Sequence, residues 1–105
     1  MSDTIVMIYC PFPSIEAARG VATVLIGEKL VACCNITSGE SLYHWEGKLE
    51  STGEYYLLAK TTADAAPLAC TRIASLHPYD TPAILHFEAA ANGPFATWVK
   101  AETGK

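Results

Sequence analysis

The spacing of apolar residues changes several times along the chain, and each change predicts a new element. Residues 4–10 (TIVMIYC) are rich in β-branched and apolar side chains, which indicates a buried strand that Pro11 should end. Ser14 is a good helix N-cap, and apolar side chains then recur at helical spacing as far as Leu30. This stretch therefore predicts an amphipathic helix.

After Leu30 the pattern becomes that of a long β-hairpin over residues 31–61. Two apolar stretches, VACCNI and SLYHW, form the first arm, and Gly39 between them predicts a bulge or a bend. Glu46-Gly47-Lys48 predicts a tight turn, and the chain returns over residues 49–61. An alternative is that the bend at Gly39 folds the hairpin back into two shorter pairs.

The rest of the chain, residues 62–105, predicts a helix, a strand and a final helix. The first of these begins at Ala63 or Pro67 and ends at Leu76. The rigid loop HPYDTP leads to a strand over residues 84–89, and a short C-terminal helix follows. The order is β-α-β-β-α-β plus a terminal helix, which predicts an α+β, ferredoxin-like fold as one domain over residues 1–105.

The length of the predicted hairpin indicates an oligomer. A strand of about 15 residues at ~3.3 Å per residue is about 50 Å long, whereas a compact domain of this size has a diameter of about 33 Å. The tip around Trp45 must then project and expose large apolar side chains such as Leu42 and Tyr55. Pairing with identical chains would cover these side chains and the free strand edges.

Composition limits the partners and the compartment. The net charge of -4 and the scattered Lys and Arg argue against nucleic acid or an anionic membrane as the main partner. The N-terminus lacks the features of a signal peptide, and no apolar run approaches a membrane span. The four cysteines, Cys10, Cys33, Cys34 and Cys70, show no zinc-binding spacing, so we expect reduced thiols in a cytoplasm.

Candidate chemistry centres on one cysteine and one histidine. No nucleophile with a base and no carboxylate pair is evident, because the carboxylates of residues 40–54 are predicted to be solvated, so we do not expect an enzyme. Cys10 ends the first strand and His77 ends a helix. A thiolate and an imidazole suit copper or zinc, although two ligands are too few for a tight site. The alternative is a buried cysteine and a helix-capping histidine.

Four motifs occur in order at fitting distances: EKLVACCNI from Glu28, SLYHWEGKLE from Ser41, LAKTT from Leu58 and HPYDTP from His77. In these motifs, and over nearly its whole length, the chain resembles the CutA family of divalent-cation tolerance proteins. The resemblance implies a cytoplasmic homotrimer of ferredoxin-like subunits whose long hairpins pair between neighbours. It also implies an architecture similar to that of the PII signalling proteins.

The resemblance implies copper ligands as well, namely a cysteine at the end of strand one and histidine before the Pro-Tyr pair. Cys10 and His77 match these positions, whereas Leu76 stands where some bacterial members have a second histidine. We therefore expect weak binding of copper, or of other divalent cations, through Cys10 and His77.

Two other functions fit the same architecture. One is a PII-like signalling module with a small-molecule or anion pocket in the clefts between subunits, built from Lys60, Tyr79 and Thr81. The other is a scaffold without a ligand, in which Tyr43, Trp45 and Tyr79 pack in an interface or in the core.

Overall fold

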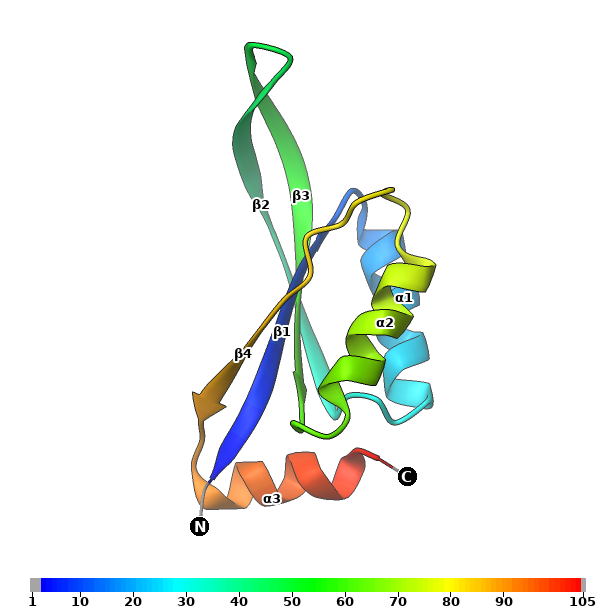
Figure 1. The fold of residues 1–105 in the computed structure, drawn as a ribbon, viewed down its shortest axis with the longest axis vertical. Helices are drawn as coiled ribbons and strands as arrows, with labels where there is room; N and C mark the ends of the chain where they lie inside the picture. Colours follow the sequence, from blue (N-terminus) through cyan, green and yellow to red (C-terminus); the bar gives the residue numbers. More distant parts are fainter. Residues whose placement is uncertain (1–2, 105) are drawn as a thin grey trace.

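A computed structural model describes residues 3–104 as a four-stranded antiparallel sheet with three helices (Figure 1). The elements follow the predicted order: β1 (Thr4–Phe12), α1 (Ile15–Gly27), β2 (Cys33–Trp45), β3 (Lys48–Thr61), α2 (Ala66–Leu76), β4 (Leu85–Ala90) and α3 (Gly93–Glu102). The strands lie in the order β2-β3-β1-β4. Helices α1 and α2 lie next to each other against the sheet, and α3 crosses its lower end (Figure 1). The predicted α+β architecture is confirmed.

The main core lies between the sheet and the pair α1 and α2. Alternate residues of β1 enter it, as the period of two requires, and Ile8, Cys10 and Phe12 are fully buried. Leu57 of β3 and Leu25 of α1 belong to the same core and are also among its largest fully buried side chains. Each such apolar side chain contributes roughly 1.5–3 kcal/mol when it is removed from water.

A smaller cluster lies on the opposite side of β1. Ile5 packs with Ala32 and with Val99 of α3, so α3 covers only the lower end of the second sheet face. Further along that face, Leu85 and Phe87 of β4 are 55% and 50% exposed. Most of this face therefore lacks a helical cover within one chain.

Helix α1 begins as predicted and ends earlier. The Ser14 hydroxyl accepts a hydrogen bond from the Ala17 amide at 3.1 Å, which confirms the N-cap. The helix stops at Gly27, because Lys29 adopts a left-handed conformation with φ 59° and reverses the chain. Leu30 lies outside the helix, and its carbonyl accepts a 2.6 Å hydrogen bond from the Thr61 hydroxyl.

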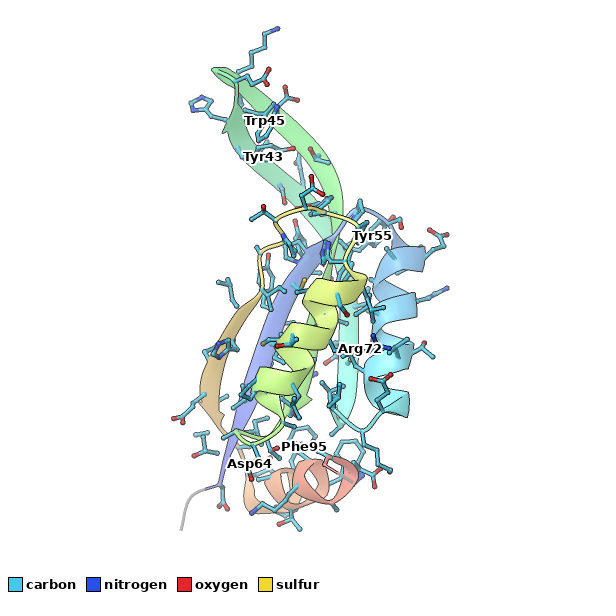
Figure 2. The ribbon with its side chains drawn as sticks, turned by 45° about the vertical axis from the view of Figure 1, so that its right-hand side comes forward. Tyr43, Trp45, Tyr55, Asp64, Arg72 and Phe95 are labelled. Atoms are coloured by element: carbon cyan, nitrogen blue, oxygen red, sulfur yellow. The ribbon has the colours of Figure 1, made fainter. Side chains whose placement is uncertain are left out.

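The two helices are joined on their outer side by an ion pair. Arg72 of α2, labelled in Figure 2, donates two hydrogen bonds to the Glu28 carboxylate, from Nε at 3.0 Å and from Nη2 at 2.9 Å. Because both side chains are well exposed, this pair contributes little to stability compared with the core.

The predicted end of β1 at Cys10 is wrong, since the strand runs through Pro11 to Phe12. The ladder with β4 stops at Tyr9, so Pro11 pairs with β3 alone, opposite Tyr56. Proline lacks an N–H and is tolerated where one side of a strand has no neighbour. Other boundaries differ by one to three residues: β2 starts at Cys33, β4 covers Leu85–Ala90, and α2 starts at Ala66.

The hairpin of β2 and β3 is unbroken, so the predicted bulge at Gly39 and the folded-back alternative are both wrong. Pairing runs one residue to one from Cys33 opposite Lys60 to Trp45 opposite Lys48. Gly39 is needed for a different reason: a Cβ there would lie 2.5 Å from Cε2 of the Tyr56 ring. The predicted tight turn is confirmed, with Glu46 and Gly47 at φ 51° and 80°.

The hairpin projects beyond the rest of the chain (Figure 1). With the hairpin included, the chain measures 48 × 24 × 20 Å along its principal axes. Leu42, Trp45 and Leu49 on the projecting part are 65%, 63% and 69% exposed. The predicted overhang is therefore confirmed. No helix within residues 3–104 is both long and apolar enough to span a membrane.

Candidate functional site

The end of β1 and the end of α2 meet at one corner of the sheet, which we call the Cys10–His77 corner. Nε2 of His77 lies 2.7 Å from the Pro11 carbonyl oxygen, across 66 residues of sequence. The imidazole also stacks on the Phe12 ring, with 4.3 Å between ring centroids. These contacts place His77 next to the strand segment that carries Cys10.

Hydrogen bonds engage both ring nitrogens of His77. The Tyr79 amide donates to Nδ1 at 3.1 Å, so this nitrogen carries the lone pair. Nε2 then carries the proton and donates to the Pro11 carbonyl. The side chain is nearly buried, at 9% exposure. In this arrangement His77 closes the corner, and a cation would have to displace one of these two bonds.

Cys10 is fully buried at the same corner. Burial, with smaller contributions from Cys70 and Glu54, raises the pKa of its thiol to about 12. The thiol is therefore protonated at neutral pH, and its Sγ donates weakly to the Pro11 carbonyl at 3.8 Å. A metal ion would have to displace this proton as well.

A polar cluster links the loop after α2 to the hairpin. The Tyr79 hydroxyl donates to Glu54 Oε2 at 3.0 Å, and the Ser41 hydroxyl donates to Glu54 Oε1 at 2.5 Å. The Ser41 hydroxyl also lies 3.0 Å from the Tyr56 hydroxyl. Burial, followed by the hydrogen bond and charge of Glu54, raises the pKa of Tyr79 to about 12.

The sequence prediction that the carboxylates of residues 40–54 are solvated is wrong for Glu54, which is half-buried and accepts these two hydrogen bonds. The register of the hairpin, which can be counted from the turn in the sequence, could have predicted this cluster. Ser41, Glu54 and Tyr56 have side chains on the same face once Glu46 and Gly47 are taken as the turn.

The other predicted site residues lie apart from the corner. Tyr43 and Trp45 lie on the projecting part of the hairpin (Figure 2), where the Tyr43 hydroxyl is 2.9 Å from that of Thr52. Thr81 is exposed in the loop before β4. Lys60 donates to the Asn35 side chain.

Lys60 and Glu54, the partner of Tyr79, are six residues apart on β3, which corresponds to about 20 Å. A single chain therefore does not bring Lys60 together with Tyr79. A pocket built from both residues needs a second chain.

Within residues 3–104, no three His, Cys, Asp or Glu side chains are close enough as folded to hold a metal ion. The Cys10–His77 corner offers two donors of the right chemistry for copper. Both are engaged in the folded chain.

These features define a class of small α+β proteins with a four-stranded antiparallel sheet and a projecting central hairpin. The family model of the CutA1 divalent ion tolerance protein matches residues 6–102, so the chain belongs to the CutA1 family.

Individual relatives agree with this assignment. The divalent-cation tolerance protein CutA of Pyrococcus horikoshii is 37% identical over 101 residues, which are 95% of this chain and 99% of the relative. The crystal structure of CutA1 from Ehrlichia chaffeensis superposes with a TM-score of 0.93 at 37% identity and 96% coverage of both chains. A structure described as the periplasmic CutA of Archaeoglobus fulgidus has a TM-score of 0.89 at 30% identity, covering 93% of this chain and 97% of that one.

Proposed function

We propose that the chain acts in divalent-cation tolerance by binding the cation itself, copper first, as a homotrimer without enzymatic activity. The family and its relatives carry divalent-cation tolerance in their names. The observation that supports a binding role for this chain is the contact between His77 and the Pro11 carbonyl. It brings an imidazole to the strand end that carries a thiol.

Binding at the Cys10–His77 corner is weak, because it competes with the fold. A cation that takes Nδ1 of His77 displaces the Tyr79 amide, and one that takes the Cys10 sulfur displaces a proton held by a raised thiol pKa. The missing second histidine at Leu76 acts in the same direction, since it leaves two protein donors.

The homotrimer is proposed because a single chain leaves large apolar side chains exposed to solvent. Leu42, Trp45 and Leu49 are exposed on the hairpin, and Leu85 and Phe87 are exposed on the sheet face beyond α3. Identical chains that pair around a closed axis would cover both regions. Sedimentation equilibrium at low concentration tests this proposal: a species of three chains supports it, and a monomer refutes it.

We propose a cytoplasmic location, in which the four thiols stay reduced. One structural relative is described as periplasmic, so the location of this chain needs a direct test. Fractionation of cells that express the untagged chain, probed with an antibody, decides between the two compartments.

Calorimetric titration with Cu(II) tests the proposed binding. We expect the wild type to bind more tightly than the double variant Cys10→Ser, His77→Gln, in which Gln keeps a donor and an acceptor for the corner. The matched control is Cys33→Ser, which removes a partly exposed thiol from β2 and should leave the isotherm unchanged. Indistinguishable isotherms for the wild type and the double variant would sink the proposal.

A further inference from the structure

A second group of metal-binding side chains lines a groove between α2 and β4, which neighbours the Cys10–His77 corner but is built from different residues. The groove has a cavity volume of about 450 Å³. Cys70 of α2 lines it together with His86 and Glu88 of β4, and its walls are otherwise mostly small or apolar. In Figure 2, α2 lies over the sheet with β4 to one side of it. We call this feature the α2–β4 groove.

The register explains why these side chains share one groove. His86 pairs with Ile8 and Glu88 pairs with Val6, and both partners belong to the core beneath the helices. His86 and Glu88 therefore point to the helix side of the sheet, with Cα atoms about 7 Å apart. Cys70 reaches the groove from above, one helical turn after Ala66, which also lines it.

These donors are free, in contrast to those at the corner. In the described part of the chain, no hydrogen bond or ion pair engages the side chains of Cys70, His86 or Glu88. His86 and Glu88 are exposed, and Cys70 is half-buried. A cation entering this groove thus breaks no hydrogen bond of the fold.

We propose that the α2–β4 groove is a second divalent-cation site of this protein, with Cys70 and His86 as ligands and Glu88 as the third donor. Sulfur, nitrogen and one carboxylate suit a borderline cation such as Zn(II), Co(II) or Cu(II), and disfavour Mg(II) and Ca(II). The three side chains do not enclose an ion as folded. The cation gathers them by side-chain rotation, which exposed residues on an edge strand allow. This site stands independently of binding at the Cys10–His77 corner.

Co(II) is the probe, because a cysteine ligand adds a thiolate-to-cobalt charge-transfer band to the spectrum. The assembled protein is titrated with Co(II) under reducing conditions, followed by Zn(II) competition. We expect Cys70→Ser to remove the band from this site, and His86→Gln to weaken Co(II) and Zn(II) binding about 10-fold or more. The matched controls are Cys33→Ser and His44→Gln, which remove the same donor types from the hairpin.

The double variant Cys10→Ser, His77→Gln separates this site from the proposed function. A band that persists in this double variant and disappears with Cys70→Ser supports the groove. In the background of this double variant, a band that survives Cys70→Ser, or binding that is unchanged by His86→Gln, overturns the proposal. If the band disappears only in the double variant, the corner binds the cation and the groove does not.

The absence of binding in the wild type rejects both sites. Because His86 is exposed, its substitution keeps the test valid even if Cys70→Ser lowers stability.

Discussion

The close approach of Gly39 to Tyr56 makes a quantitative prediction for the hairpin. In Gly39→Ala the new Cβ would lie 2.5 Å from Cε2 of the Tyr56 ring, so the ring must move by about 1 Å to reach an ordinary contact. The ring is not free to move, because it stacks on Tyr9 at 5.8 Å and its hydroxyl is 3.0 Å from the Ser41 hydroxyl.

The expected cost follows from these two constraints. Overpacking costs about 1–3 kcal/mol, and loss of the Tyr56 hydroxyl contact adds up to about 1 kcal/mol. We therefore expect Gly39→Ala to lower the free energy of unfolding by about 2 kcal/mol in guanidinium titrations. Protein concentration must be held fixed, because assembly contributes to the measured stability.

Gly53→Ala is the matched control on the facing strand. Gly53 pairs with Glu40, and a Cβ there meets nothing within 4 Å, so this change should be neutral or stabilising by up to about 1 kcal/mol. In a Tyr56→Ala background, Gly39→Ala should lose its cost. The reasoning is refuted if Gly39→Ala and Gly53→Ala unfold at the same denaturant concentration.

Three further predictions concern local contacts. Ser14→Ala removes the N-cap of α1 and should cost about 1 kcal/mol in urea unfolding, whereas Ser14→Asp should stay close to the wild type; equal midpoints for all three would contradict the cap. Tyr79→Phe removes the donor to Glu54 and should cost roughly 1 kcal/mol and speed proteolysis of the loop after α2; unchanged cleavage would count against the contact. Hydrogen bonds from Arg72 lower the pKa of the Glu28 carboxyl below its ordinary 4.5. The stability from this pair is therefore full above pH 4.5 and is lost as the pH falls through the lower folded value. Glu28→Gln should flatten the stability curve in that acidic window, and a curve parallel to the wild type would contradict this.

The fold was largely predictable because its signals are local. The Ser14 cap, the tight turn at Glu46-Gly47 and the alternation along β1 each depend on neighbouring residues, and all three are present. The overhang followed from strand length alone.

Two of the errors depend on a distant residue, and the third depends on a local backbone conformation. Gly39 resembles a bulge in sequence, but its missing Cβ makes room for the ring of Tyr56 on the facing strand. Pro11 resembles a strand end, but it continues β1 because β4 stops pairing at Tyr9. Leu30 continued the helical spacing, and only the left-handed conformation of Lys29 removed it from α1.

The candidate site also has a part that the sequence predicts and a part that depends on tertiary contacts. Cys10 and His77 were proposed as ligands from residue type, position and the family resemblance, but their engagement depends on contacts with the Pro11 carbonyl and the Tyr79 amide that no short motif encodes. The role of Glu54 required the register of the hairpin, which fixes which side chains share a face.

The unbroken pairing of the hairpin also restricts how its length can evolve or be engineered. A single residue inserted into either arm would turn every side chain beyond it to the opposite face, so that Tyr43 would no longer meet Thr52. Insertions that keep both faces intact add two residues to each arm and move the tip outward by about 7 Å. We therefore expect natural or designed length variants to differ in steps of two residues per arm, or to carry a compensating bulge.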